Sequence, residues 1–211
     1  MEQKEKLILM ADVIGSRKVD QRQLMSDFQE VVSAVNKEEK MNFLSPMTIT
    51  LGDEFQSVLK DLGSALSVIL KIEERLVKEK KSFKLRYVLI EGDIDTKLNR
   101  KIAHGMLGTG LTLARESLAA MKTHKNRFYF NIKDKEKNQV LNQLFFILKE
   151  LVDYWNVEKD YYIVSKFLEH KDYKQVAFEL DKERSLIWKR KKSLKIDEYF
   201  ALKEVILYLG K

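Results

Sequence analysis

The sequence contains no cysteine, a single proline at position 46 and only eight glycines among its 211 residues. Without cysteine the chain has no disulfide, no thiolate nucleophile and no cysteine-bound zinc or iron–sulfur cluster. The scarcity of proline and glycine excludes collagen-like, linker-rich and low-complexity proteins. The three histidines are scattered, which disfavours a histidine-based metal site. Any chemistry must therefore rest on carboxylates, cations and hydroxyl groups.

The chain also lacks a long apolar run. The first apolar segment, residues 7–14, is interrupted by Asp12, whereas a signal peptide needs a longer apolar core. No segment reaches the roughly 18 apolar residues of a membrane span, so we expect a cytoplasmic protein.

The 39 basic and 32 acidic side chains of the chain give a net charge of +7. That balance permits a nucleic-acid or phosphate partner without requiring one.

Hydrophobic periodicity predicts an N-terminal α+β unit. Short apolar or alternating runs predict strands, and spacing of three to four residues predicts helices. Strands are expected at residues 7–14, 47–51, 55–59, 83–90 and 126–132, and helices at 20–40, 62–76 and 111–121. The order β-α-β-β-α-β, followed by one more helix and strand, is the split βαβ or ferredoxin-like pattern. Residues 93–104 are polar and are expected to form a loop or a hairpin arm.

From about residue 133 the strand signal ends and the pattern becomes helical, which indicates a change of fold class along the chain. We expect a palm-like ferredoxin domain at residues 1–135, a connecting helix at 136–157 and a helix-turn-helix domain at 158–211.

Two carboxylates mark a candidate site in the first unit. Asp12 interrupts an apolar strand, and Asp53 follows Gly52 at a predicted hairpin tip. In a split βαβ fold these segments are neighbours, and two adjacent carboxylates repel unless a cation or a positive group lies between them. Mg²⁺ is the natural metal because it binds one or two carboxylates together with substrate phosphates. The alternative is that Asp53 is a turn residue and Asp12 a capping residue.

Ser16 and Arg17 follow the first strand and offer donors to a phosphate group. An ordinary strand-to-helix turn with solvated charges is the preferred interpretation of these two residues. His104 and His124 stand alone and are interpreted as surface or packing residues.

Four segments in order resemble the SatD family of bacterial proteins and, more widely, the palm of class III nucleotidyl cyclases and GGDEF proteins. They read MADVIGSR, TITLGDEFQSVL, LRYVLIEGDI and GMLGTGLTLARESL, and they span about residues 7–120. The resemblance implies metal binding by Asp12 and Asp53, with the backbone of Val13 as a further ligand. It also implies a nucleotide ligand near these residues.

The chain departs from the cyclase pattern where cyclases carry an Asn and an Arg that stabilise the reacting nucleotide. Those positions are Thr112 and Glu116, although Arg115 stands one place earlier and is the remaining candidate for phosphate contact. The adenine-selecting Lys of cyclases is Ile49. Loss of one preorganised donor costs ~10²–10³ in rate, so these departures argue against cyclase activity.

The C-terminal segment predicts a helix-turn-helix. The text KQVAFEL followed by SLIWKR resembles the motif of sigma-factor-like and transposase-like regulators, with Asp181 where such turns usually carry Gly. Residues 182–195 hold seven basic side chains and one acidic one, on the helix that this fold inserts into the major groove. The expected DNA-facing residues are Arg184, Ser185, Trp188, Lys189 and Lys192. A solvated basic helix, or a helix-turn-helix kept for protein contact, is the alternative.

Together these patterns predict a cytoplasmic DNA-binding regulator whose N-terminal domain senses a metal-bound nucleotide or another phosphorylated ligand. A homodimer is expected, because helix-turn-helix proteins bind paired half-sites. The alternatives are a Mg²⁺-dependent nucleotidyl cyclase or transferase, and a protein-interaction adaptor that lacks both activities.

Overall fold

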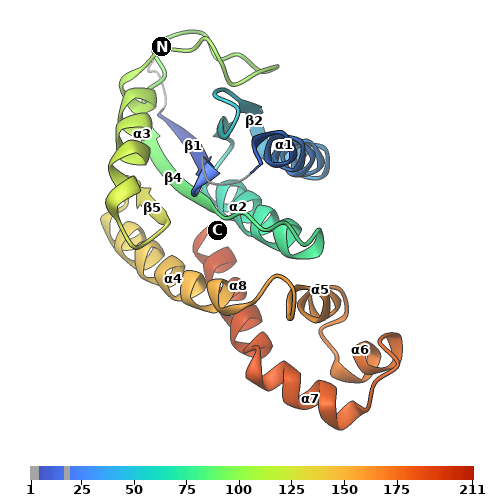
Figure 1. Cartoon of the computed structure of the whole chain (residues 1–211). Helices are drawn as coiled ribbons and strands as arrows, with labels where there is room; N and C mark the ends of the chain where they lie inside the picture. Colours follow the sequence, from blue (N-terminus) through green and yellow to red (C-terminus); the bar gives the residue numbers. More distant parts are fainter. Residues whose placement is uncertain (1–4, 17–19) are drawn as a thin grey trace.

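The computed structural model describes residues 5–16 and 20–211 and contains a central sheet flanked by helices (Figure 1). The sheet order is β2-β3-β1-β4-β5. Its strands are β1 (Lys6–Val13), β2 (Phe43–Ile49), β3 (Glu54–Leu59), β4 (Leu85–Gly92) and β5 (Phe128–Asn131). β1 runs antiparallel to both β3 and β4, and β5 is added parallel to β4 at the edge. The first four strands and their helices thus follow the predicted β-α-β-β-α-β order, in a mixed α+β fold.

Helices cover both faces of the sheet. On one face α1 (Gln21–Glu38) and α2 (Leu62–Lys78) pack against alternate strand residues such as Leu9 and Leu89. On the other face α3 (Thr109–Ala120) and the loop before it cover Ile8, Met10 and Val88. α3 begins very close to β4, because a Cβ atom on Gly110 would lie 2.7 Å from the backbone of Gly92.

Asparagine side chains occupy both edges of the sheet. Asn36 of α1 accepts a hydrogen bond from the Met47 N–H at 2.9 Å and donates to the Met47 carbonyl at 2.8 Å. At the opposite edge Asn142 bonds the N–H and carbonyl of Phe130 at 3.1 and 2.9 Å. Unpaired strand edges invite pairing with other chains, and on each edge strand one of these amides satisfies the backbone groups of one residue, Met47 or Phe130.

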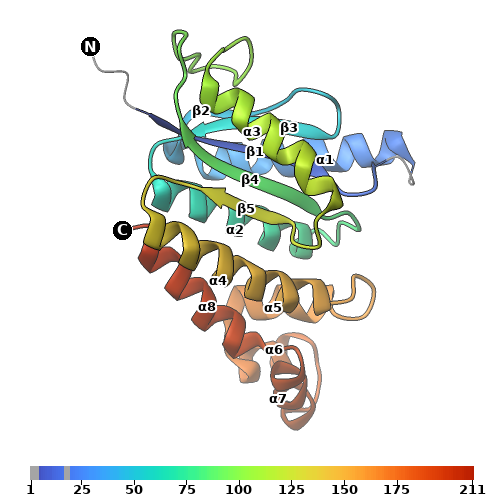
Figure 2. The ribbon, with the colours of Figure 1, turned by 90° about the vertical axis from the view of Figure 1, so that its left-hand side faces the viewer.

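Five helices complete the chain: α4 (Lys135–Tyr154), α5 (Tyr161–His170), α6 (Tyr173–Glu179), α7 (Arg184–Ser193) and α8 (Ile196–Leu209). α4 packs on β5, and α8 lies beside α4 and against α2 (Figure 2). Lys137 near the start of α4 donates to the Leu209 carbonyl at 3.1 Å, and Trp155 after its end donates to the Leu194 carbonyl at 2.9 Å. α4 and α8 are therefore antiparallel. In the described residues every helix is too short or too polar to cross a lipid bilayer.

One continuous apolar core joins the sheet to the C-terminal helices. The same cluster holds Leu9 and Phe28 near the sheet, Phe145 on α4, and Ile187 and Tyr199 on α7 and α8. The C-terminal helices thus share their buried surface with the N-terminal unit. The division into residues 1–135, 136–157 and 158–211 stays a prediction about folding units, and this apolar cluster extends across it.

Several element boundaries differ from the prediction. β2 begins at Phe43 rather than at residue 47, and it includes Pro46, which an edge strand tolerates because its outer side needs no N–H donor. α4 begins at Lys135 because the Asp134 side chain caps it, accepting from the Lys137 N–H at 3.0 Å. Short 3₁₀ turns, η2 (Lys40–Asn42) and η3 (Met121–Thr123), follow α1 and α3.

Candidate functional site

The ends of β1 and β3 bring the two predicted carboxylates into one region. The Val13 N–H donates to the Asp53 carbonyl at 2.9 Å, which closes the strand pair beside the hairpin turn. In the sheet register Asp12 lies between Glu54 of β3 and Arg86 of β4. Paired residues of antiparallel strands point to the same face. Glu54, Asp12 and Arg86 therefore form a charged row across the sheet.

Arg86 is the positive group that accompanies Asp12. Its Nη1 donates to both carboxylate oxygens of Asp12 at 2.8 Å, and both side chains are buried. Burial raises the pKa of Asp12 to about 6, while Arg86 and Lys122 oppose the rise and the neighbouring carboxylates of Asp53 and Glu54 add to it. A buried carboxylate needs such a partner, because an unpaired charge in the interior is very costly.

Asp53 has a different environment. It follows Gly52, whose φ of +83° belongs to the region that favours glycine. Ser16 donates its hydroxyl to Asp53 Oδ2 at 2.6 Å, and the side chain remains partly accessible. One carboxylate oxygen of Asp53 is thus fixed by a hydroxyl, and no hydrogen bond within the described residues engages the other.

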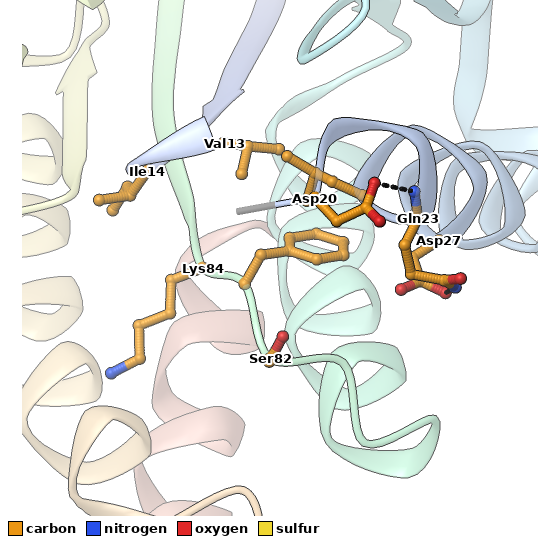
Figure 3. Close-up of a pocket in the computed structure, with 9 residues that line it drawn as sticks. Val13, Ile14, Asp20, Gln23, Asp27, Ser82 and Lys84 are labelled. Atoms are coloured by element: carbon orange, nitrogen blue, oxygen red, sulfur yellow. Dashed lines mark hydrogen bonds between the residues drawn. The ribbon is translucent and has the colours of Figure 1, made fainter. Parts of the chain in front are cut away.

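Two cavities flank the segment that leaves β1. The larger, of about 410 Å³, lies between the end of β1, α1 and the start of β4 (Figure 3). Its polar lining includes Asp20, which caps α1, and Asp27 and Lys84. Lys84 pairs with Asp153 at 3.1 Å, and Asp27 pairs with Lys81 at 2.8 Å. The smaller cavity, of about 230 Å³, is lined by Ser16, Gly52 and Asp53 among others. Small-molecule pockets typically measure about 300–1,000 Å³.

The remaining predicted ligand residues are not all part of this region. Arg17 lies outside the described residues. Arg115 is exposed on α3, and within the described chain it makes no hydrogen bond or ion pair with the carboxylates. The sequence interpretation missed Arg86 and Lys122. The signal for Arg86 was present, because it is a charged residue inside an apolar alternating strand, as Asp12 is.

The carboxylate pair fits a shared metal ion poorly in this arrangement. Both oxygens of Asp12 already bind Arg86, so joint coordination would require Asp12 to leave its partner. Of the two, Asp53 has an oxygen that no described residue engages, which suits Mg²⁺ held mainly by ligand phosphates. Elsewhere in the described chain, three potential ligand groups come together only at Glu169, His170 and Glu179. These are exposed, and Lys166 already bonds Glu179 at 2.7 Å.

A second candidate region is formed by α6, the turn at residues 180–183 and α7. Val176 and Ala177 of α6 are buried against Ile187 of α7, and the small Ala177 side chain allows close approach. Asp181 in the turn has φ of +49°, in the left-handed region that Asp enters more readily than most residues. The turn is closed by the Lys182 N–H, which donates to the Ala177 carbonyl at 3.0 Å.

α7 presents its polar side chains to solvent. The residues predicted to face DNA are all exposed: Arg184, Ser185, Trp188, Lys189 and Lys192. Lys192 bonds Asp197 at 3.0 Å. Within the described residues Arg184 and Lys189 make no ion pair. The other cations of the helix are used internally, since Arg190 binds Asp160 at 2.5 Å and Lys191 binds Asp197 at 2.6 Å.

Apolar groups accompany these cations. Trp188 is 47% exposed and Phe178 of α6 is 82% exposed, whereas the other tryptophan, Trp155, is buried. Exposed aromatic side chains beside cations are typical of surfaces that stack the bases of single-stranded nucleic acids, so they do not by themselves indicate a duplex.

Comparison with solved structures finds domains of nucleotidyl cyclases. A bacterial light-regulated adenylyl cyclase aligns over 60% of this chain and 75% of its own, with 16% identity and a TM-score of 0.41. The catalytic core of a rhodopsin-guanylyl cyclase aligns over 56% and 72%, with 16% identity and a TM-score of 0.40. A dimeric guanylyl cyclase domain from the aquatic fungus Blastocladiella emersonii aligns over 56% and 74%, with 16% identity and a TM-score of 0.38.

Comparison with curated proteins gives no significant match. The family model described as "SatD family" matches residues 6–209, which is nearly the whole length. The chain therefore belongs to the SatD family.

Proposed function

We propose that the protein binds double-stranded DNA through α7, with α6 and α7 acting as a helix-turn-helix. The observation that carries the proposal is the solvent-facing surface of α7, where Arg184 and Lys189 lie beside Ser185 and Trp188 and make no ion pair with any described residue. A recognition helix lies in the major groove and contacts base edges with its N-terminal residues. Arg184 and Ser185 are the first two residues of α7, so they occupy the positions that such a helix presents to bases.

The charge of α7 supports a nucleic acid over an acidic protein. Residues 182–195 carry seven basic side chains and one acidic one, in a chain whose total excess is seven. Phosphate contacts by lysine and arginine supply most non-specific DNA affinity, and each neutralised phosphate changes the slope of log affinity against log salt by about −0.9. We infer a regulatory role for the protein from this proposed binding to DNA.

The first experiment measures binding to a fluorescein-labelled random 30-base-pair duplex by anisotropy, at salt concentrations from 50 to 200 mM. Wild type should bind with a steep salt dependence. The variant Arg184→Ala/Lys189→Ala should bind more weakly and lose about two units of slope. The matched control is Arg100→Ala/Lys101→Ala, which removes one exposed arginine and one exposed lysine from the loop before α3. It should behave as wild type.

Tryptophan fluorescence provides a second readout. Trp155 is buried and bonded to the Leu194 carbonyl, so a change on adding unlabelled duplex reports on Trp188. Binding of wild type without any tryptophan signal would place the DNA elsewhere on the protein. Absence of binding at 50 mM salt, or equal loss in the two double variants, would overturn the proposal.

A second candidate function is binding of a phosphorylated ligand, such as a Mg²⁺-bound nucleotide, at the end of β1. The specific observation is the pair of cavities there, one of them lined by Ser16 and Asp53, whose second carboxylate oxygen no described residue engages. Asp53 would hold the metal. Asp12 would join it only after leaving Arg86. The backbone of Val13 is close enough to Asp53 to share in such a site.

Thermal unfolding tests this second function. Wild type and Asp53→Asn are heated with nucleoside triphosphates, with and without Mg²⁺ or Mn²⁺. A ligand at 100 times its dissociation constant adds about 2.7 kcal/mol of stability, which gives a clear shift. A metal-dependent shift that Asp53→Asn abolishes supports the site and justifies a turnover assay for cyclase or transferase activity. No shift with any nucleotide rejects both the sensor and the enzyme.

A further inference from the structure

We propose that a cavity between the end of α3, β5 and α4 binds a small planar aromatic molecule that carries a carbonyl or carboxylate oxygen. Figure 2 shows β5 between α3 and α4, and a cavity of about 430 Å³ is lined by residues of these three elements and of the segment that joins α3 to β5. Pockets for small molecules typically measure about 300–1,000 Å³. The cavity shares no lining residue with the two cavities at the end of β1, so this site goes beyond both proposed functions.

The backbone of β5 beside the cavity is already bonded, which disfavours an added strand as the occupant. β5 is the edge strand of the sheet. The N–H groups of Phe128 and Phe130 donate to the side chains of Asn126 and Asn142, at 3.2 and 3.1 Å. A peptide, or a second copy of this chain, that extended the sheet would need those main-chain groups. The arrangement therefore favours a small molecule that side chains hold.

The apolar part of the lining suits an aromatic ring. Met121 and Phe128 are buried, whereas Tyr129 is 38% exposed. In the described part of the chain no other ring packs on Tyr129. Rings stack favourably on a tyrosine, and the thioether of a methionine also makes favourable contacts with a ring. A planar aromatic ligand would use surface that the protein itself leaves without a partner.

The polar part of the lining offers hydrogen-bond donors. Asn126 is oriented by the Phe128 N–H, which donates to its Oδ1, so that its Nδ2 remains as a donor. Ser117 and His124 also line the cavity, and their side chains make no hydrogen bond to any described residue. A hydroxyl and an imidazole can both donate. None of the lining residues is acidic, so the cavity selects a ligand with acceptor oxygens.

Saturation-transfer difference NMR of the full chain tests the site with indole-3-carboxylate, hypoxanthine and indole. The first two carry an acceptor oxygen on a planar ring, as a carboxylate and as a carbonyl, and their comparison distinguishes a charged ligand from a neutral one. Indole supplies the ring alone. At least one acceptor probe should bind, and indole should bind about tenfold more weakly or worse, because it leaves the donors of the cavity unsatisfied.

Two neighbouring alanines of α3 provide a matched pair of variants. Ala120 lines the cavity and Ala119 does not, and both are exposed. Ala120→Trp fills the cavity and should abolish the signal of the acceptor probes. Ala119→Trp introduces the same ring outside the cavity and should bind like wild type. Circular dichroism confirms that both variants are folded.

Asn126→Asp tests the polar part of the site. An aspartate keeps the acceptor for the Phe128 N–H and replaces the Nδ2 donor by a carboxylate oxygen, so indole-3-carboxylate should bind about tenfold more weakly or worse. Failure of both acceptor probes to bind wild type overturns the proposal. Binding to Ala120→Trp as tight as to wild type does so too, as does indole binding as tightly as the acceptor probes.

Variants of the other two regions keep the proposals distinct. Arg184→Ala/Lys189→Ala and Asp53→Asn should bind the acceptor probes like wild type, because these residues do not line the cavity. Probe binding without affinity for duplex DNA or nucleotides would reject the proposed functions and leave this site standing. Loss of probe binding in Asp53→Asn would place the probe at the end of β1 and overturn this inference.

Discussion

Arg127 is the centre of the buried polar network that joins the sheet to α4. Its guanidinium donates to Glu73 of α2 at 2.9 and 2.6 Å, to the Leu85 carbonyl at 3.1 Å and to Asp153 of α4 at 3.2 Å. Tyr87 donates to the same Glu73 carboxylate at 2.7 Å. Burial alone would lower the pKa of Arg127, but the charge and hydrogen bonds of Glu73 raise it above its usual value. Arg127 therefore stays charged, and each of these polar side chains has a hydrogen-bond partner.

Removing one partner of a buried ion pair leaves an uncompensated charge. We expect Arg127→Met to lower the free energy of unfolding by about 3–5 kcal/mol, measured by urea denaturation. The control Arg22→Met, at an exposed position on α1, should change stability by less than about 0.5 kcal/mol. A loss below about 1 kcal/mol for Arg127→Met would show that Glu73 finds another cation.

Asp12 predicts a pH dependence of stability. Burial raises its folded-state pKa from 3.8 to about 6 despite Arg86, so the folded protein binds this proton more tightly than the unfolded chain. The stabilisation is complete below about pH 4 and is lost as the pH rises through 6. A pKa shift contributes about 1.4 kcal/mol per unit. Between pH 4 and pH 7 the free energy of unfolding of wild type should therefore fall by up to about 3 kcal/mol relative to that of Asp12→Asn. A stability difference that stays flat, or rises, over this range would contradict the pKa shift.

At the scale of elements, the turn between α6 and α7 sets the orientation of α7, the helix for which we propose DNA binding. Asp181 holds φ of +49° and makes no side-chain hydrogen bond within the described chain. Left-handed backbone costs most residues about 1–2 kcal/mol, whereas glycine adopts it freely. The backbone at Asp181 is therefore slightly strained, and a glycine there would remove the strain.

Asp181→Gly should therefore stabilise the protein by up to about 1 kcal/mol and leave DNA affinity unchanged, because the backbone of the turn is retained. Thermal unfolding and duplex anisotropy measure the two effects. Asp181→Val is the opposite test, since a β-branched residue is strongly disfavoured at positive φ. It should destabilise α6–α7 and weaken binding. If both variants were neutral, the conformation of Asp181 would not be what positions α7.

At the scale of the whole molecule, the continuous core predicts cooperative unfolding. Trp155 lies between α4 and α8, stacked edge-on against Tyr199 at 5.2 Å, and Tyr199 in turn donates to Glu74 of α2 at 2.9 Å. The C-terminal helices thus share core contacts with the N-terminal unit. Urea unfolding followed by tryptophan fluorescence and by far-ultraviolet circular dichroism should give coincident single transitions.

Truncation after residue 157 complements this measurement. Removing α5–α8 exposes the apolar surfaces of α2 and α4 that they cover, so we expect the remaining fragment to aggregate or unfold at lower temperature. Two separate transitions in the full chain, together with a stable fragment, would show instead that the predicted boundary near residues 136–157 divides independent folding units.

The sequence by itself determined the chain order of strands and helices, the hairpin at Gly52 and the basic, exposed face of α7. These features depend on local periodicity, turn chemistry and charge, which neighbouring residues fix. Only the tertiary structure decided that Arg86 is the partner of Asp12. The two residues are 74 positions apart, and the sheet register that pairs them arises from packing along the whole strand. The same long-range packing placed Arg127 on Glu73 and joined the C-terminal helices to the sheet and α2.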